Sequence, residues 1–314
     1  MSRRPRPDAA GGPSRGGSRS RPAPALPVGP VEIDTGTAEL VPDGPGAVTL
    51  LVNGVPSSHL AFDDPARLDF EYLDRMAAVI ATLPPGPLAA VHLGAAGCGL
   101  ARHIEAQRPG SRQIGIDLDA RLLTLVRQWF DLPRSPRLRL RPGDAREVLA
   151  SLPDASADVV VRDVFAGSDT PAHVTTAEFL GEVRRVLRPG GVYLANCVDR
   201  PPLHLARSEV STAREALGEV GLVAEPGQLK GRRYGNLVVI ATLPGEPGPW
   251  EASAALERAL RSLAVPATLV TDADAAAFAG RAPVLRDAPP ASPGDGLRHP
   301  AVTAPRPGHD EGRP

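Results

Sequence analysis

The amino-acid sequence predicts a doubly wound α/β fold: a mostly parallel sheet with an antiparallel last strand, preceded by a small β-meander. Between residues 86 and 245, apolar runs of strand length alternate with helical patterns at the spacing of βαβ units. A Gly-rich turn follows the first run, and the last two runs lie too close together for a crossover helix. Parallel strands joined by right-handed crossovers, with one final hairpin, follow from this pattern.

The segment before the sheet, residues 30–85, is expected to form a meander followed by a helix. Short apolar runs between residues 31 and 61 are broken by Gly and Pro, which is typical of antiparallel strands joined by tight turns. Residues 68–83 place Phe70 and Leu73 on one helical face. We therefore expect a small antiparallel sheet and one helix ahead of the main domain.

The main domain, residues 86–245, carries six strand patterns and three long helical patterns. The expected strands are 88–93, 113–118, 137–140, 158–162, 192–196 and 236–242. The expected helices are 121–130, 176–187 and 208–220. Because the strand at 236–242 follows a short connection, we expect it to run antiparallel to its neighbours.

An extension and two tails complete the chain. The extension covers residues 246–287, and its part at 249–281 shows a helix, a strand and a second helix, which is short enough to pack on the main domain. Residues 1–29 are rich in Arg, Pro and Gly, and residues 288–314 are rich in Pro. Neither tail carries enough large apolar side chains to offset the entropy of ordering, so both are predicted to be disordered.

Composition and charge argue against several classes of function. The formal charge is -1, with 35 basic and 36 acidic residues, which argues against a dedicated nucleic-acid binder. No apolar run approaches the length that spans a bilayer. Cys98 and Cys197 share no metal-ligand spacing, and the histidines show none either, so we predict no metal. A cytoplasmic protein without nucleic-acid or membrane partners is expected.

The Gly-rich turn after the first strand reads GAAGCG from Gly94 to Gly99. Small residues allow a tight turn and a close approach of the backbone to a ligand, beside the free N–H groups of a helix N-terminus. We predict Gly94, Ala96, Gly97 and Gly99 as cofactor-binding residues. Taken alone, the motif supports a turn that serves only packing nearly as well.

The ends of the second, third and fourth strands carry carboxylates suited to a nucleoside. We predict that Asp117 accepts ribose hydroxyls, with Asp119 as the alternative or as a helix N-cap. Asp144 could accept an adenine amino group or cap the next helix. Asp163 should face the reactive end of the ligand, because ligands lie at the carboxyl ends of strands in doubly wound sheets. Its alternative role is to cap the following loop.

Together with the turn LRPGG at 187–191, these motifs have an order and spacing typical of the class I methyltransferase-like superfamily, a Rossmann-like fold. A nicotinamide-binding Rossmann domain shares the Gly-rich turn and the first carboxylate. It lacks the carboxylate at Asp144, the 187–191 turn and the antiparallel last strand. The resemblance therefore implies S-adenosylmethionine or its decarboxylated form as the cofactor.

Within that superfamily the chain resembles the spermidine synthase family of polyamine aminopropyltransferases, over about residues 48 to 241. The motifs that carry the resemblance are LVNGVPS at 51–57, FEY at 70–72, DLD at 117–119, GD at 143–144, DVFAG at 163–167 and TAEF at 176–179. The resemblance implies a transferase of polyamine biosynthesis. It would move an aminopropyl group from decarboxylated S-adenosylmethionine to a small-molecule amine, in a homodimer.

Three positions depart from the family's motifs: Asn53, Ser57 and Ala166 stand where the family has an Asp, a Gln and the second Asp of D-x-x-D. In the family that second Asp takes part in activating the attacking amine, a role that alanine cannot perform. The resemblance implies that Asp163 and Tyr72 orient the amine. Asp169, three residues beyond Ala166, could replace the missing carboxylate.

Two other functions stay open. A small-molecule methyltransferase would need an Arg or an amide-rich pocket for the carboxylate of S-adenosylmethionine, whereas acidic residues favour the aminopropyl group. Arg162 adjoins Asp163 in sequence, but strand alternation is expected to point it away. A non-catalytic nucleoside-binding scaffold is the third hypothesis, and Ala166 is the residue that supports it.

Overall fold

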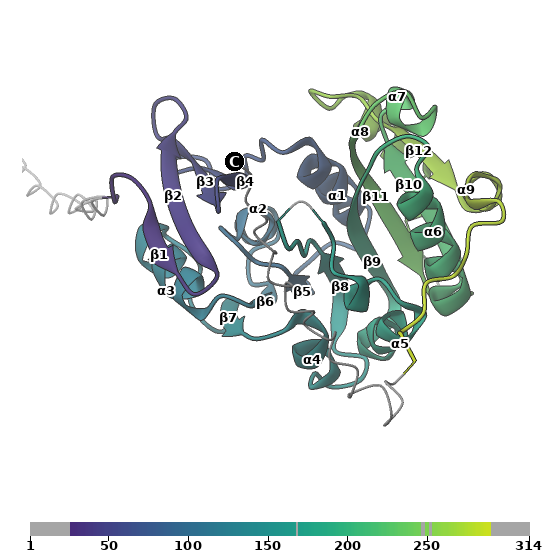
Figure 1. Cartoon of the computed structure of the whole chain (residues 1–314), viewed down its shortest axis with the longest axis horizontal. Helices are drawn as coiled ribbons and strands as arrows, with labels where there is room; N and C mark the ends of the chain where they lie inside the picture. The colour runs from purple at the N-terminus through teal and green to yellow at the C-terminus, as the bar shows by residue number, and fades with distance from the viewer. Residues whose placement is uncertain (1–25, 168, 246–248, 251–252, 290–314) are drawn as a thin grey trace, which may run out of the picture.

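The computed structural model describes residues 26–167, 169–245, 249–250 and 253–289, which form two sheets and the helices around them (Figure 1). The two tails predicted to be disordered lie outside these ranges, except for a few residues at their inner ends. No helix in these ranges combines the length and the apolar character that crossing a membrane requires.

The small sheet is an antiparallel meander in chain order, as predicted. Its strands are β1 (Val31–Ile33), β2 (Gly36–Pro42), β3 (Ala47–Val52) and β4 (Val55–Ala61). Ala38, Leu50 and Leu60 are fully buried in an apolar cluster that this sheet shares with α3 (Ala120–Trp129). Burial of this apolar surface fixes the meander against the main domain.

The main sheet has eight strands in the described residues: β5 (Ala89–Leu93), β6 (Arg112–Asp117), β7 (Leu138–Pro142), β8 (Ala157–Arg162), β9 (Leu187–Asp199), β10 (Glu219–Ala224), β11 (Gly235–Thr242) and β12 (Thr268–Thr271). Their order is β12-β10-β11-β9-β8-β5-β6-β7. Strand β11 runs antiparallel between β9 and β10, and β12 pairs antiparallel with β10 at the edge. The predicted fold class is confirmed.

Helices cover both faces of the main sheet. On one face lie α1 (Glu71–Ala81), α2 (Gly99–Gln107) and α8 (Ser253–Arg261), and on the other lie α4 (Ala145–Ala150), α5 (Ala177–Val186), α6 (His204–Leu217) and α9 (Asp272–Ala279). A short α7 (Pro226–Leu229) and a 3-10 turn η1 (Ala172–Val174) complete the described elements. In Figure 1 the purple meander stands beside α3 at one end of the sheet, and the green C-terminal strands form the other end.

The helix predicted at 208–220 begins earlier, at His204, and the helix predicted at 68–83 ends earlier, at Ala81. The other two boundaries of these helices differ from the prediction for a local reason. The helix predicted at 68–83 begins at Glu71, because Phe70 has an extended backbone with φ of -85° and ψ of 119°. The helix predicted at 208–220 ends before Gly218, whose φ of 108° is left-handed. A glycine takes up that conformation without the steric cost of a side chain, so it allows the chain to leave the helix and enter β10.

The extension continues the main sheet. The helix, strand and second helix predicted at 249–281 are present as α8, β12 and α9. The Trp250 indole N–H donates to Thr242 Oγ1 at 3.1 Å. After α9 the chain runs along α5 and α6 as an extended segment, residues 282–289, which we call the C-terminal strap. Its Leu285 carbonyl accepts from the Ala177 N–H at 2.9 Å.

Candidate active site

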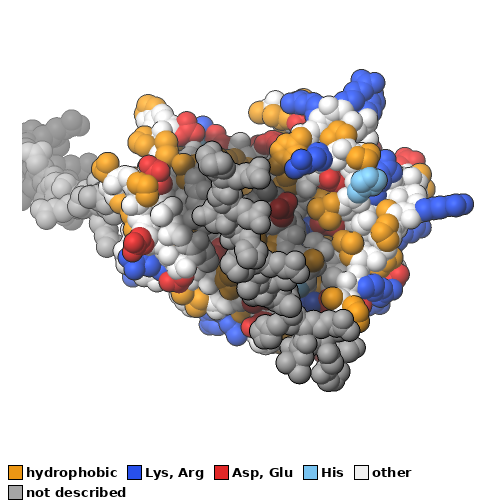
Figure 2. All heavy atoms as spheres, viewed as in Figure 1, with side chains coloured by type: hydrophobic (Ala, Val, Ile, Leu, Met, Phe, Trp, Pro, Cys, Tyr) orange, Lys and Arg blue, Asp and Glu red, His pale blue; other side chains and the backbone are white. Residues whose placement is uncertain are grey.

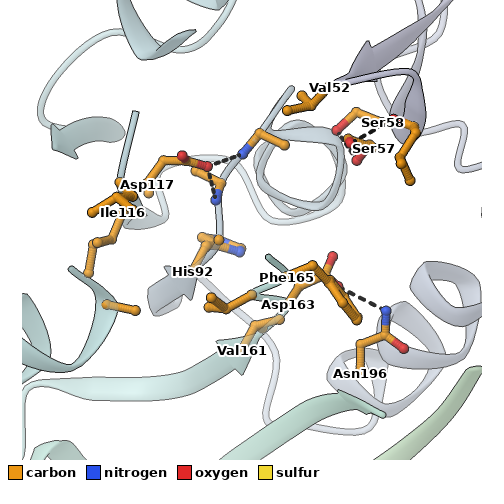
Figure 3. Close-up of a pocket in the computed structure, with 18 of the residues that line it drawn as sticks. Val52, Ser57, Ser58, His92, Ile116, Asp117, Val161, Asp163, Phe165 and Asn196 are labelled. Carbon is orange, nitrogen blue, oxygen red and sulfur yellow. Dashed lines mark hydrogen bonds between the residues drawn. The ribbon is translucent and has the colours of Figure 1, made fainter. Parts of the chain in front are cut away.

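A cavity of about 700 Å³ opens at the carboxyl ends of β5, β6, β7 and β8, next to the meander (Figure 3). Five carboxylates line it: Glu71, Asp117, Asp119, Asp144 and Asp163. No Lys or Arg is among the described residues that line it. On the uncovered part of the face in Figure 2, most Lys and Arg side chains lie toward the outer edges. The cavity therefore favours cationic ligands.

The first residue of the Gly-rich turn is held where only glycine fits. Gly94 has a φ of 83°, and its N–H donates to the Ile116 carbonyl at 2.9 Å. A Cβ at this position would lie 2.1 Å from the backbone oxygen of Asp163. The turn after β5 thus passes in contact with the end of β8, and glycine makes this close approach possible.

The remaining residues of the turn have different roles. Ala96 and Gly99 line the cavity, where they were predicted to bind the cofactor. Gly97 is not among the lining residues: its N–H donates to Ser58 Oγ of β4 at 2.9 Å, and a Cβ there would lie 2.7 Å from Ser58 Cβ. Gly97 therefore packs against the meander, and its cofactor contact stays a prediction.

The structure distinguishes the roles of Asp117 and Asp119, which the sequence left open. Asp117 Oδ2 accepts the N–H groups of Ala95 at 3.2 Å and Ala96 at 3.0 Å (Figure 3). Burial raises its pKa, and these backbone hydrogen bonds oppose the rise. Asp119 accepts from Leu122 N–H at 2.6 Å as the N-cap of α3, and its other oxygen is taken up by Thr35. Asp117 Oδ1 accepts the Asp119 N–H at 3.1 Å, so about one acceptor position of the Asp117 carboxylate stays open, and Asp119 is the helix cap.

Asp144 both caps a helix and faces the cavity. Its Oδ1 accepts the N–H groups of Arg146 at 2.9 Å and Glu147 at 3.1 Å, at the start of α4. Its Oδ2 lies 2.8 Å from Nε2 of His173 in η1. Burial acts to raise the pKa of Asp144, but these hydrogen bonds outweigh it and the pKa is lowered. The carboxylate is therefore held in a fixed orientation where α4 begins, at the edge of the cavity.

Asp163 lies at the other end of the cavity, where three elements converge. Its Oδ2 accepts from the Tyr72 hydroxyl of α1 at 2.8 Å, and its Oδ1 accepts from Nδ2 of Asn196 of β9 at 2.9 Å (Figure 3). Burial raises the pKa of the Asp163 carboxyl, and it raises the pKa of Tyr72 well above the usual range. The predicted pair of Asp163 and Tyr72 is brought together by a direct hydrogen bond.

Arg162 points away from the cavity, as strand alternation predicted. It is fully buried and pairs with Glu209 of α6, and its Nε donates to the Tyr193 hydroxyl at 3.2 Å. Burial raises the pKa of the Glu209 carboxyl, and the adjacent Arg162 guanidinium opposes that rise. The guanidinium therefore lies on the opposite face of β8.

The structure does not bring Asp169 to the cavity. Its N–H and carbonyl face Ala166 across a tight bridge, with the Ala166 N–H donating to the Asp169 carbonyl at 2.8 Å. The Asp169 side chain is exposed, and it is not among the lining residues. Asp163 thus has no second carboxylate from this loop.

Glu71, Asn196 and Asn236 line the cavity although none was predicted as a site residue. Glu71 is the first residue of α1, and Asn236 Nδ2 lies 3.4 Å from its Oε1. The Asn236 carbonyl accepts from Nη1 of buried Arg75 at 2.8 Å, which ties α1 to β11. A signal existed for Asn196, a polar residue at the end of a predicted strand. None existed for the other two, because they meet only through the sheet order.

Replacing Tyr72 by Phe is expected to move the acid limb of the pH–rate profile to higher pH. The Tyr72 hydrogen bond is one of the contacts that lower the pKa of Asp163 against the effect of burial. Without it, Asp163 takes up a proton at higher pH, so the ionised form is lost earlier as the pH falls. The measurement is kcat/KM against pH for both proteins, and an unchanged acid limb would contradict this role.

A Gly-rich turn, carboxylates that line a cavity at the ends of the strands, and strand β11 inserted antiparallel between β9 and β10 together characterise the class I S-adenosylmethionine-dependent methyltransferase-like superfamily. The family model described as a methyltransferase domain matches residues 93–195, from the end of β5 into β9. Among the described residues, no group of three His, Cys, Asp or Glu side chains is placed to hold a metal ion.

Individual relatives narrow the assignment. A probable spermidine synthase of Corynebacterium glutamicum is 35% identical, with a TM-score of 0.78 over 85% of this chain and 99% of that chain. The polyamine aminopropyltransferase of Vibrio vulnificus is 27% identical over 222 residues, 68% of this chain and 73% of that protein. A probable S-adenosylmethionine-dependent methyltransferase of Mycolicibacterium smegmatis is 40% identical over 90 residues, 28% of this chain and 30% of that protein. The chain belongs to the spermidine synthase family, a family of transferases.

Proposed function

We propose that this protein transfers an aminopropyl group from decarboxylated S-adenosylmethionine to a small amine. The observation that supports this is the charge of the cavity: five lining carboxylates and, among its described lining residues, no Lys or Arg. The carboxylate of S-adenosylmethionine would meet no cationic partner, since Arg162 is paired with Glu209 on the other face. The ammonium group of the decarboxylated form would face acidic side chains instead.

The residues at the nucleoside end fit an adenosyl group. Gly94 lets the turn after β5 pass in contact with the backbone of Asp163, at the edge of the cavity. The Asp117 carboxylate accepts three backbone N–H groups, which leaves about one acceptor position for a ribose hydroxyl, and Asp144 lines the cavity for an amino group of the base. When bound, the cofactor supplies a sulfonium that makes the adjacent carbon open to attack.

At the reactive end, Asp163 would orient the acceptor amine. A neutral amine N–H donates to the carboxylate, which Tyr72 and Asn196 hold in place, and its lone pair is left to attack. Transfer forms one N–C bond and breaks one C–S bond, with the sulfur keeping the electron pair. The nitrogen then loses one proton, and Asp163, whose pKa burial raises, can accept it.

Glu71 is the second carboxylate that we assign to the acceptor. It lines the cavity one residue before Tyr72, and Asn236 contacts it from β11. An acceptor with its attacking nitrogen at Asp163 could place a second ammonium near Glu71. The charge of the cavity therefore favours diamines over monoamines.

Replacing Glu71 by Gln is expected to raise the KM for a diamine by about tenfold, the equivalent of about 1.4 kcal/mol of lost charge attraction. The KM for a monoamine of equal length should change by less than about twofold. Asp74→Asn is the matched control, because Asp74 lies on the same helix outside the cavity lining. An equal rise for both amines in the Glu71 variant would contradict the assignment.

A second candidate is methyl transfer to a small molecule. Ala166 favours it, since the carboxylate that the family places there is absent and Asp169 does not substitute for it. The similarity to a methyltransferase of Mycolicibacterium smegmatis points the same way. The homodimer and the cytoplasmic location expected from the sequence stay predictions.

The experiment that separates the candidates is a pair of parallel incubations of the full chain. One contains decarboxylated S-adenosylmethionine and the other S-adenosylmethionine, each with the same panel of monoamines and diamines. Mass spectrometry of the products should show aminopropylated diamine in the first and no methylated product in the second. Methylated product alone would support the second candidate, and no product in either would favour a non-catalytic scaffold.

A further inference from the structure

We propose that the C-terminal strap is part of the nucleoside-binding site, and that Asp287 in it positions the residues that recognise the base. The strap ends the described chain, more than a hundred residues beyond the strands that carry the cofactor motifs. This inference goes beyond aminopropyl transfer, because it applies equally to any adenosyl cofactor.

Asp287 joins the starts of two helices. Its Oδ1 and Oδ2 accept from Nη1 and Nη2 of Arg146 at 2.7 and 2.6 Å, a two-pronged pair at the start of α4. Its Oδ1 also accepts from Thr176 Oγ1 at 2.8 Å, and Thr176 is the N-cap of α5. The Arg146 hydrogen bond lowers the pKa of Asp287 to about 2, so the carboxylate is charged under ordinary conditions.

A continuous set of contacts leads from Asp287 to the cavity. Arg146 Nη1 also donates to the backbone carbonyl of His173 in η1, at 3.2 Å. His173 Nε2 lies 2.8 Å from Asp144 Oδ2, and both His173 and Asp144 line the cavity. The η1 turn precedes Thr176 in the chain, so Asp287 is linked to it twice, directly through Thr176 and indirectly through Arg146.

The position of His173 decides what Asp144 can recognise. An ionised carboxylate only accepts hydrogen bonds, so Asp144 Oδ2 binds the 6-amino group of adenine and repels the 6-oxo group of hypoxanthine. With His173 in place, this oxygen is oriented toward the cavity and stays ionised. If η1 loosens, Asp144 loses that orientation, and the preference for a 6-amino purine should fall.

The test is Asp287→Asn in the full chain, with calorimetric binding of methylthioadenosine and methylthioinosine. We expect affinity for methylthioadenosine to fall about tenfold while that for methylthioinosine changes less than about twofold. Arg286→Gln is the matched control: Arg286 lies in the same strap but pairs with Glu215 and Glu178, away from the cavity. Both affinities should be unchanged in this control.

Two further variants exclude a purely structural effect. Arg146→Gln keeps the contact between Asp287 and Thr176 but removes both the pair with Asp287 and the link to η1. It should therefore reduce the preference for methylthioadenosine over methylthioinosine, as Asp287→Asn does. In a His173→Ala background, Asp287→Asn should change the affinity for methylthioadenosine by less than about twofold. The proposal would be overturned if Asp287→Asn lowered the affinities for both nucleosides equally or lowered neither. It would also be overturned if the effects of Asp287→Asn and His173→Ala on the affinity for methylthioadenosine were fully additive. If the unaltered chain binds neither nucleoside, both this proposal and the assignment of an adenosyl cofactor are wrong.

Discussion

Replacing Asp163 by Asn is expected to lower kcat/KM by about two to four orders of magnitude, with methylthioadenosine affinity kept within about threefold. The amide has the same size as the carboxyl group but can neither accept a proton nor attract an ammonium ion. The Tyr72 hydroxyl and the Asn196 amide both donate to this carboxylate and fix its orientation at the cavity. Steady-state kinetics and calorimetric titration of the same preparation measure both quantities.

The same variant should unfold at an equal or higher temperature. Burial raises the pKa of Asp163, so at neutral pH the folded state bears the cost of keeping a buried charge, and a neutral amide removes this cost. Asp158→Asn is the control on the other end of β8. Asp158 pairs with Arg188 and accepts the Ala89 N–H, so its loss should lower stability and leave kcat/KM nearly unchanged. Equal kinetic losses in the two variants would contradict a catalytic role for Asp163.

Replacing Gly94 by Ala is expected to destabilise the fold by about 2–5 kcal/mol and to abolish nucleoside binding. About 1–2 kcal/mol comes from the left-handed backbone and about 1–3 kcal/mol from overpacking. The overpacking is specific, because the new Cβ would lie 2.1 Å from the backbone oxygen of Asp163. Moving that oxygen also moves the Asp163 carboxylate, to which we assign the acceptor amine.

Gly44→Ala is a closely matched control for this effect. Gly44 has a φ of 82°, nearly that of Gly94, and nothing lies within 4 Å of a Cβ built on it. The control variant should lose only the part of the unfolding free energy that comes from the left-handed backbone conformation. Denaturant unfolding of both variants measures the difference in their free energies of unfolding. Equal losses of stability would show that the contact with Asp163 is not what requires glycine at position 94.

The local part of the site could be predicted from the sequence. Asp117, Asp144 and Asp163 each follow a strand pattern, and the carboxyl ends of parallel strands meet at one edge, so their grouping follows from the fold class alone. Tyr72 came from the resemblance to the spermidine synthase family. Between Asp117 and Asp119, the sequence left the choice open, and it was decided by a contact from Thr35, 84 residues away in the chain.

The residues that could not be predicted are those whose role depends on distant contacts. Glu71 and Asn236 come together because β11 is inserted next to β9, and no local pattern carries that information. Asp287 lies at the end of the predicted extension, one residue before a predicted tail. Its role depends on Arg146, 141 residues earlier. Side-chain pairing across such separations is set by packing, which single-sequence patterns do not encode.

The central claim is that the acidic cavity selects a cofactor without a carboxylate. Its most direct test is calorimetric titration of the purified chain with S-adenosylmethionine, decarboxylated S-adenosylmethionine and methylthioadenosine. We expect the decarboxylated cofactor and methylthioadenosine to bind at least about tenfold more tightly than S-adenosylmethionine, because only the last brings a carboxylate into a cavity with no described cationic lining residue. Tighter binding of S-adenosylmethionine would contradict the claim and favour methyl transfer.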